Sequence, residues 1–291
     1  MVKSKRTKLT DLLIVVICLV IMIITLLPFL NVAASSLSSP QAIIKRQVSI
    51  WPVGFTLDSY IYVFNDPSFS HSLIWTVILT VICMLVSMTL TILCAYPLIY
   101  DYLKGKRVLN AIMIITMYFN AGIIPNYILM KDLHLIDNPL VLIIPNALSV
   151  FNVIILRSFL YGIPDSLRES AEIDGANPFT TLIRIYLPLS TSVLATLALF
   201  YAVGRWNGFS DALQYMTERQ WQPIQLKLYY IINNQASIEI AQNEGLAGGV
   251  PATSEGLQTA SIMFATVPIL LAYPWLQRYF ITGVTIGAVK G

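Results

Sequence analysis

Residue types that often do chemistry are scarce in this chain. Its 291 residues include two histidines and three cysteines. Cys18, Cys83 and Cys94 lie inside apolar runs and lack the spacing of metal ligands, so we interpret them as small buried apolar residues. His71 and His134 are isolated and have no acidic or metal-binding partners at ligand spacing. We therefore expect no catalytic site and no metal site in this chain.

One polar segment, residues 162–188, differs from the apolar sequence around it. Pro164 suits the start of a helix, and Gly175 suits the left-handed position that ends one. Asn177 is a good cap for a following helix that has Pro178 at its first position. The spacing predicts two short helices joined by a tight turn. The chain has no Gly-x-x-x-x-Gly-Lys-Ser/Thr pattern for holding nucleotide phosphates, so we expect neither an ATP site of that kind nor enzyme activity.

The elements that must position this segment are strongly apolar. The chain is 56% hydrophobic and 11% charged, whereas soluble domains carry about 25% charged residues. Crossing a bilayer takes roughly 20 apolar residues, and only a helix satisfies the backbone of such a segment in lipid. We predict an all-α, polytopic membrane protein in which residues 1–291 form a single transmembrane domain. Its six transmembrane helices are expected at about 12–32, 73–98, 109–130, 140–160, 187–203 and 257–276.

The positions of Lys and Arg predict the orientation of these spans. Cytoplasmic connections are enriched in Lys and Arg. Most of the 18 basic residues lie in the N-terminal stretch, in the connections 101–110 and 162–188, and near the C-terminus. This bias predicts that both termini and the segment 162–188 are cytoplasmic. The first apolar run also follows basic residues, as in a signal peptide, but it is long, and we expect an uncleaved first span.

The outer connections differ in composition. Residues 33–72 combine aromatic and turn residues, which is typical of an interfacial segment with a short helix. Residues 205–256 begin with aromatic residues and end in the polar, glycine-containing run 243–256, which we expect to be a mobile loop. Prolines such as Pro125 and Pro145 lie within the spans, where membrane helices commonly tolerate them.

The segment 162–188 resembles the conserved cytoplasmic loop of ABC importer permeases. That loop has a Glu-Ala-Ala opening, a Gly after three residues, and an Ile-x-Leu-Pro ending after nine more. The positions that match with this spacing are Glu169, Ala171, Gly175, Ile185, Leu187 and Pro188. Ser170 stands where the family has the first Ala of this opening, so one small residue replaces another. The form Asp174-Gly175-Ala176 is typical of the carbohydrate-importing branch.

The resemblance continues from the third span to the C-terminus. Asn120–Tyr127 is similar to the third-span segment of this branch, and Arg205–Asp211 to the aromatic turn after span five. Tyr273–Phe280 and Gly283–Gly291 resemble the family ending. The subgroup that this sequence resembles comprises permeases for complex oligosaccharides derived from plants or hosts.

The resemblance implies a division of labour in a multi-pass protein of the bacterial plasma membrane. A separate nucleotide-binding subunit would bind ATP and Mg²⁺, so this chain itself needs no cofactor. A homologous second permease subunit and an extracytoplasmic sugar-binding protein are the other implied partners, with membrane lipid and an oligosaccharide substrate, and no nucleic acid. The loop 162–188 would act as a coupling helix-turn-helix that docks on the ATPase subunit, and the tail near 287–291 would touch the same subunit. The implied ATPase-coupling residues are Glu169, Ser170, Ala171, Asp174, Gly175 and Ala176, with Arg168 and Glu172 as additional charges at the rim.

A saccharide path needs amide, hydroxyl and aromatic side chains. Such residues are costly in a bilayer unless they are paired or face a cavity. Candidates for the substrate path are Tyr118, Asn120, Asn126, Tyr127, Asn146, Asn152, Trp206 and Asn207. The alternative role of each is a hydrogen bond between helices.

Three other functions are considered. A permease for another neutral solute would keep the loop, and the absence of Lys and Arg from the middle of the spans disfavours a strongly charged solute. A membrane-embedded enzyme acting on lipid-linked sugars would need carboxylate or histidine clusters at the membrane edge. A channel would need no such loop and would conduct without ATP. Co-purification with an ATPase subunit would separate these functions from a sugar importer.

Overall fold

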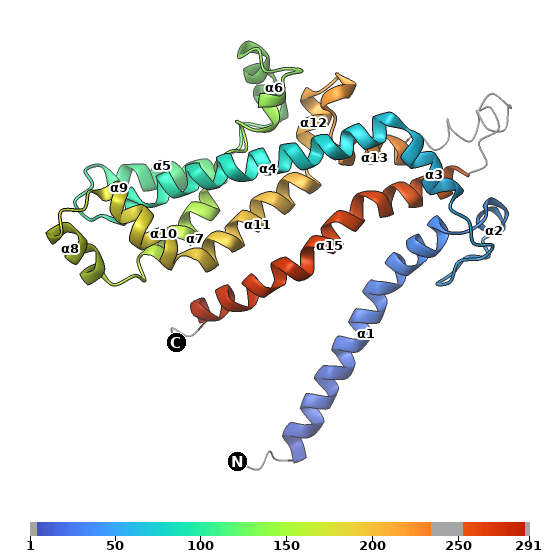
Figure 1. Cartoon of the computed structure of the whole chain (residues 1–291), viewed down its shortest axis with the longest axis horizontal. Helices are drawn as coiled ribbons and strands as arrows, with labels where there is room; N and C mark the ends of the chain where they lie inside the picture. The colour runs from blue at the N-terminus through green and yellow to red at the C-terminus, as the bar shows by residue number, and fades with distance from the viewer. Residues whose placement is uncertain (1–4, 234–252, 289–291) are drawn as a thin grey trace. The chain divides into compact units, whose positions relative to one another are not determined.

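The computed structural model describes residues 5–233 and 253–288, with side chains at 11–233 and 253–271. Throughout these ranges every regular element is a helix (Figure 1). The chain divides into two compact units, Met1–Ser70 with Lys227–Ile269 and His71–Leu226 with Leu270–Gly291. The two units are defined by how the helices pack. The prediction that residues 1–291 form a single transmembrane domain stays a prediction.

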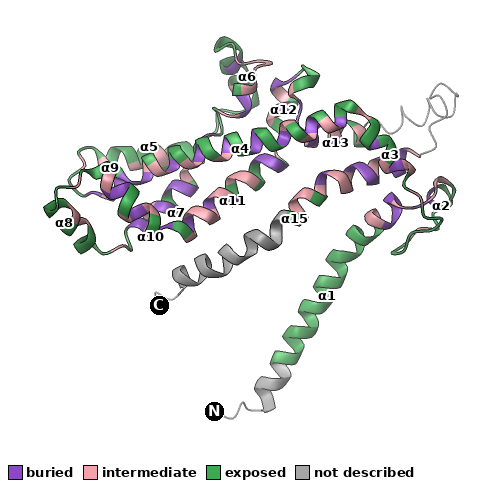
Figure 2. Ribbon diagram, viewed as in Figure 1, coloured by how far each residue is buried: buried purple, intermediate pink, exposed green. Residues whose placement is uncertain are grey.

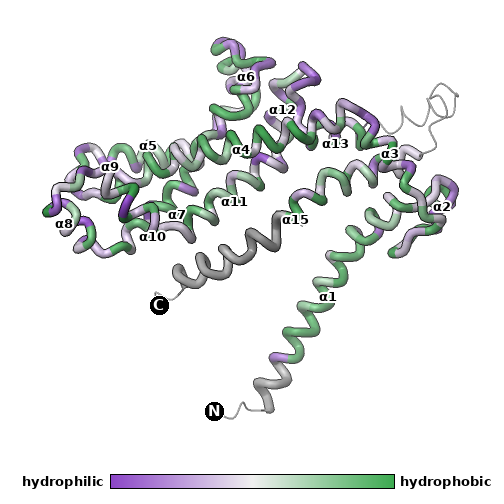
Figure 3. The backbone as a smooth tube through the Cα atoms, in the orientation of Figure 1, coloured by the Kyte–Doolittle hydropathy of each residue, from purple (hydrophilic) through white to green (hydrophobic). Residues whose placement is uncertain are grey.

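The first unit begins with the long helix α1 (Lys5–Ser36). The apolar stretch Asp11–Ser36 has no buried residue in its most hydrophobic window, and Figures 2 and 3 show it as exposed and hydrophobic. A helix with apolar residues all round its surface is stable where lipid or another subunit covers it. Two short helices follow, α2 (Pro40–Ile44) and α3 (Asp58–Asn65), so the expected short helix in residues 33–72 is present.

Helix α15 (Ser254–Ala288) contains the whole of the predicted sixth span, 257–276. In the first unit the ring of Phe264 meets the rings of Phe64 and Phe69, with centroids 4.9 and 5.7 Å away. A Cβ atom on Gly256 would lie 3.0 Å from Ser59 Oγ, so the helix packs closely at that point. The prediction of a mobile loop over 243–256 is wrong at its end, because Ser254 to Gly256 form the first turn of α15. The rest of that run lies outside the described residues.

The core of the second unit forms where four helical segments meet. These are the end of α4 (Pro67–Ala95), α7 (Val150–Leu160), the turn η3 (Leu182–Tyr186) and α11 (Thr191–Asn207). The buried side chains at this point include Leu156, Tyr186 and Leu197, together with Tyr96, which directly follows α4. Helix α5 (Lys106–Tyr118) contacts α7 beside this core.

The predicted span 109–130 is not one continuous helix. It consists of α5 and α6 (Ile123–Asp132), whose axes differ by 115°. Gly122 between them has φ +94°, a backbone conformation that favours glycine. The side-chain oxygen of Asn120 accepts the N–H of Gly122 at 2.8 Å, which stabilises the turn.

The predicted spans 140–160 and 187–203 also contain breaks. In the former, only α7 is α-helical; a 3₁₀ turn, η2 (Pro139–Leu142), precedes it, and Pro145 lies in the irregular stretch between them. In the latter, Pro178–Leu189 and Thr191–Asn207 meet at Ser190 with an 85° change of direction. Helix α11 then continues beyond 203, so Arg205 and Trp206 belong to a helix rather than to an outer loop as expected.

The length and hydropathy of the helices agree with a membrane protein. Over the described residues, two helical stretches, Asp11–Ser36 and Pro67–Ile99, are long and apolar enough to cross a bilayer. The number rises to five if each of three bent helix pairs is one span. The predicted sixth span ends beyond the side chains that the structure describes.

Candidate functional site

The segment 162–188 contains the two predicted short helices. They are α8 (Asp165–Ile173) and α9 (Pro178–Thr181). Gly175 has φ +79°; its N–H donates to Glu172 O at 3.1 Å, and the N–H of Ala176 donates to Ala171 O at 2.8 Å. This pair of hydrogen bonds is the Schellman motif, which ends a helix at a left-handed residue. The side chain of Asn177 then accepts the N–H of Thr180 at 2.8 Å and caps α9.

The surface of this helix-turn-helix presents apolar residues to the outside. No residue of α8 is buried. Ile173 is 86% exposed and Phe179 is 63% exposed. The proposed coupling residues surround them: Glu169, Ser170, Asp174 and Gly175 are exposed, and Ala171 and Ala176 are half-buried. Figure 1 shows α8 at one end of its unit, so this surface is available to a partner.

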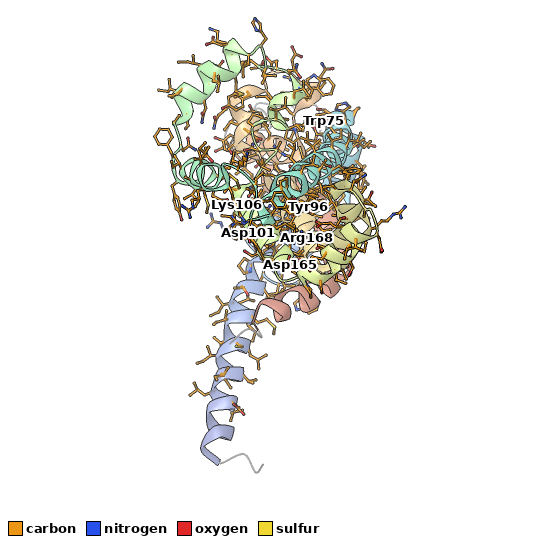
Figure 4. All side chains as sticks on the ribbon, turned by 90° about the vertical axis from the view of Figure 1, so that its left-hand side faces the viewer. Trp75, Tyr96, Asp101, Lys106, Asp165 and Arg168 are labelled. Carbon is orange, nitrogen blue, oxygen red and sulfur yellow. The ribbon has the colours of Figure 1, made fainter. Side chains whose placement is uncertain are left out.

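The inner side of α8 is fixed by Arg168. Its guanidinium donates to Glu172 at 2.8 Å, and Asp165 Oδ1 lies 3.6 Å away. The same guanidinium lies over the ring of Tyr100, 5.5 Å from the centroid. Arg168 and Asp165 are labelled in Figure 4. The hydrogen bond that Arg168 donates to Glu172 raises the pKa of the guanidinium above its ordinary value. Arg168 and Glu172 pair with each other in the described structure, and their role as rim charges for a partner stays a prediction.

After α9 the helix widens into the π-helical turn η3 before α10 (Leu187–Leu189). A π turn inserts an extra residue and is frequent at functional sites. Its last residue, Tyr186, is 2% exposed and belongs to the core of the unit. The predicted second helix is thus present but irregular.

A cavity of about 520 Å³ lies among α4, α7, α11 and the turn that follows α11. Its wall combines aromatic rings with polar side chains. The polar wall residues are Ser87, Asn146, Ser149, Asn152, Tyr201, Arg205 and Asp211, and the aromatic ones include Phe151 and Phe200.

The charged part of this wall is a two-point ion pair. Arg205 Nη1 lies 2.5 Å from Asp211 Oδ2, and Nη2 lies 3.0 Å from Oδ1. The same nitrogens donate to Leu142 O and Gly208 O at 3.2 and 2.9 Å. A Cβ atom on Gly208 would lie 2.8 Å from Nη2, so glycine makes room for the arginine. The pair is buried and neutral overall, which lets a charged arginine occupy a membrane helix.

The structure separates the predicted substrate-path residues. Asn152 and Asn146 line the cavity. Tyr118, Asn120, Asn126 and Tyr127 lie at the α5–α6 bend, where Tyr118 is 80% exposed and Tyr127 stacks on Tyr215 with centroids 6.1 Å apart. Trp206 is buried and Asn207 is exposed at the end of α11.

Sequence reasoning did not select Ser87, Tyr201, Arg205 or Asp211 as cavity residues. The pair Arg205 and Asp211 lies at the two ends of the segment that the family resemblance had singled out. Opposite charges six residues apart in an apolar context were the available signal. Ser87 and Tyr201 carry no comparable signal, because hydroxyl residues in membrane helices most often bond to the helix itself.

A second polar contact joins two loops of the same unit. Asp137 accepts the hydroxyl and the N–H of Thr217 and, at 3.0 Å, the N–H of Glu218. These bonds, led by the Thr217 hydroxyl, lower the pKa of Asp137. The connection fixes the loop after α6 to the loop after α12 (Ser210–Tyr215). Nearby, Trp75 Nε1 donates to Trp221 O at 2.8 Å (Trp75 is labelled in Figure 4).

An apolar helical protein with a polar cavity among its helices and an exposed helix-glycine-helix segment belongs to the class of membrane transport subunits. Residues 4–286 match the family described as binding-protein-dependent transport system inner membrane component, and the chain belongs to this family. It is therefore a permease subunit of an importer in the bacterial plasma membrane, and it leaves ATP hydrolysis to a separate subunit.

Similar proteins agree with this assignment over nearly the whole chain. Protein LplC of Bacillus subtilis (strain 168) is 40% identical, covering 92% of this chain and 90% of its own. The polygalacturonan/rhamnogalacturonan transport system permease protein YtcP of the same organism is 37% identical, covering 98% and 100%. A chain in the crystal structure of a bacterial ABC transporter involved in the import of the acidic polysaccharide alginate is 30% identical. It superposes with a TM-score of 0.89, covering 96% of this chain and 99% of its own.

Proposed function

We propose that this chain is one of two transmembrane subunits of an ATP-driven oligosaccharide importer. The partners are a homologous second permease, ATPase subunits that bind ATP and Mg²⁺, and an extracytoplasmic sugar-binding protein. The observation that carries the proposal is the exposed α8–α9 unit in a chain of this family. Relatives named for the transport of polygalacturonan, rhamnogalacturonan and arabinooligosaccharides, and the alginate importer, support the choice of cargo.

The topology that we propose has six spans and both termini in the cytoplasm. Helices α1, α4, α7, α11 and α15 and the bent pair α5–α6 each supply one crossing, and the α8–α9 unit lies on the cytoplasmic side. The positive charges of Lys104, Lys106 and Arg107 around the start of α5 agree with this side, because cytoplasmic connections are rich in such residues.

In this function α8 and α9 dock on the ATPase subunit. The exposed apolar side chains of Ile173 and Phe179 form the contact, and Glu169, Ser170, Ala171, Asp174, Gly175 and Ala176 surround it. Transmitting force requires an element with discrete arrangements, not a flexible connector. The Schellman turn, the Asn177 cap and the Arg168–Glu172 pair make the segment rigid. The tail residues 287–291, expected to touch the ATPase, extend beyond the described part of the chain.

The cavity beside Arg205 is the part of this subunit that we assign to the sugar path. Asn146 and Asn152 offer amides, Asp211 offers carboxylate oxygen, and Phe151 and Phe200 offer aromatic faces. Hydroxyl-rich rings are bound by such combinations. The neutral Arg205–Asp211 pair gives the cavity no net charge to repel a saccharide.

The test is ATPase activity of the assembled transporter in proteoliposomes with its binding protein. Arabino-oligosaccharides, oligogalacturonides and alginate oligosaccharides are added one at a time. We expect at least one of them to stimulate ATP hydrolysis and to be imported. Stimulation by an amino acid or an inorganic ion instead, with no response to any sugar, would contradict the cargo. Ion conduction without ATP, or turnover of a lipid-linked sugar, would contradict the transport mechanism itself.

A further inference from the structure

A pair of tyrosines directly after α4, Tyr96 and Tyr100, contacts both coupling helices. The hydroxyl of Tyr96 donates to Pro178 O, the first carbonyl of α9, at 2.9 Å. The hydroxyls of Tyr96 and Tyr100 are also hydrogen-bonded to each other. A phenol has one proton to donate, and that of Tyr96 goes to Pro178. Tyr100 must therefore donate to Tyr96, which gives a directed chain of hydrogen bonds from Tyr100 through Tyr96 to α9.

The same tyrosines reach α8 and the π turn through their rings. Arg168 of α8 lies over the ring of Tyr100 at 5.5 Å. Tyr186, at the end of η3, meets the ring of Tyr96 edge to face at 5.3 Å. Figure 4 labels Tyr96 and Arg168 at the end of the molecule that faces the viewer. The two tyrosines after α4 thus contact α8, α9 and η3.

The carbonyl oxygen of Pro178 accepts two hydrogen bonds. It accepts the N–H of Leu182 within the helix as well as the Tyr96 hydroxyl, and Leu182 is the first residue of the π turn. A carbonyl oxygen has two lone pairs, so both bonds can form together. Tyr96 consequently holds the backbone at the junction where α9 changes into η3.

Within the described residues, the bond from Tyr96 to Pro178 is the single hydrogen bond between residues 165–186 and residues 67–100. It is partly shielded from water, because Tyr96 is 6% exposed whereas Pro178 is exposed. Partial shielding lowers the local dielectric constant and strengthens a hydrogen bond relative to one in water.

We propose that Tyr96 is a positioning residue that transmits the displacement of the coupling helices to helix α4. The inference rests on the coupling role proposed above for α8 and α9. When the ATPase subunit moves α8 and α9, the Pro178 carbonyl moves Tyr96, and Tyr96 moves the end of α4. Helix α4 also supplies Cys83 and Ser87 to the wall of the sugar cavity, so the displacement reaches the cavity through one rigid helix.

The experiment replaces Tyr96 by Phe in the assembled transporter, reconstituted with its binding protein and the sugar that gives the largest stimulation in the panel above. The substitution keeps the ring against Tyr186 and removes the bond to Pro178. The measured quantity is sugar molecules imported per ATP hydrolysed. We expect this ratio to fall about fivefold, the factor that one neutral hydrogen bond supplies. A loss of folded protein alone would lower both rates and leave the ratio unchanged.

Tyr102→Phe is the matched control. Tyr102 touches the ring of Tyr100 with centroids 5.1 Å apart and is 71% exposed, and its hydroxyl has no hydrogen bond in the described structure. This variant should keep the wild-type ratio. An unchanged ratio in Tyr96→Phe would overturn the inference, and so would an equal fall in Tyr102→Phe.

Gly175→Leu, measured in parallel, distinguishes the proposed role of Tyr96 from the proposed docking of α8 and α9 on the ATPase subunit. If Gly175→Leu abolishes stimulation while Tyr96→Phe retains the wild-type ratio, the role of Tyr96 is wrong and docking stands. If both variants behave as wild type, the docking role is wrong as well. Should Tyr96→Phe not assemble, Tyr100→Phe removes the donor to Tyr96 and keeps both rings. It should lower the ratio about twofold, the lower range for a hydrogen bond, and an unchanged ratio would again overturn the inference.

Discussion

Arg205 and Asp211 face each other across a single turn at the end of α11, joined by two nitrogen–oxygen contacts of 2.5 and 3.0 Å. The pair is 6 residues apart in sequence, and the same guanidinium also bonds to Leu142 O, which lies 63 residues away. It therefore fixes the wall of the cavity and connects α11 to the 3₁₀ turn η2 before α7.

Removing one member of this pair should strongly destabilise the folded protein. Asp211→Asn leaves the charge of Arg205 buried without a counter-ion, and breaking a buried pair in this way costs about 3–5 kcal/mol. We expect a large loss of thermal stability in detergent. The double variant Arg205→Met with Asp211→Leu should recover much of it, because no unpaired charge remains. If Asp211→Asn melts at the wild-type temperature, the pair has no structural role.

Gly175 and Gly105 form a matched pair for testing the coupling turn. Both have positive φ, +79° and +82°, and at neither position would a Cβ atom meet another atom within 4 Å. Leucine at either site should cost about 1–2 kcal/mol of backbone strain. The stability loss should therefore be similar, measured by thermal unfolding. Only Gly175→Leu should also abolish sugar-stimulated ATPase activity, because Gly105 lies outside the docking surface.

The difference in ATPase stimulation between the two variants tests whether the Gly175 turn docks on the ATPase subunit. Equal ATPase stimulation in the two variants would mean that the Gly175 turn does not dock. Loss of stimulation in both would assign the effect to strain in the fold. Subunit assembly is checked by co-purification in each case.

The Asp137 contact predicts a pH-dependent stability. Hydrogen bonds from Thr217 and Glu218 hold the pKa of Asp137 below its ordinary value when the protein is folded. A carboxylate whose pKa is lower in the folded than in the unfolded protein stabilises the folded state. This contribution is complete above the pKa of the unfolded state, about 3.9, and it is lost as the pH falls through the pKa of the folded state. Asp137→Asn should thus melt lower than wild type at neutral pH, with a difference that shrinks below about pH 4.

Asp132 on α6 provides the comparison for this titration, because no polar contact in the described structure holds its carboxylate. Asp132→Asn should keep the wild-type dependence of the melting temperature on pH. A difference between Asp137→Asn and wild type that stays constant from neutral pH to pH 3 would contradict the role of the carboxylate charge.

Local signals account for what the sequence predicts well. The α8–α9 unit follows from Gly175, Asn177 and Pro178, each of which acts on its own backbone or within three residues. The apolar character of α1 and α4 follows from composition alone. Family membership follows from the same short segment, because its spacing is fixed by the turn.

The remaining features depend on contacts between distant residues. The break at Gly122 interrupts an apolar run that is long enough for one helix, so hydropathy alone predicts a continuous helix there. The π turn at Leu182–Tyr186 is stabilised by packing of Tyr186 in the core. The cavity wall requires Arg205 to meet Leu142, and the tyrosine pair requires Tyr96 to meet Pro178, 82 residues away. Periodicity and spacing contain no information on such pairs.

The central claim is that α8 and α9 dock on an ATPase subunit in the cytoplasm. The most direct measurement uses Ile173→Cys in a background where Cys18, Cys83 and Cys94 are replaced by Ser or Ala. A membrane-impermeant maleimide is applied to sealed right-side-out and inside-out vesicles, with and without the ATPase subunits. The account predicts labelling in inside-out vesicles alone, and protection of the thiol when the ATPase subunits are bound. Labelling from the outer side, or equal labelling with and without the ATPase, would contradict it.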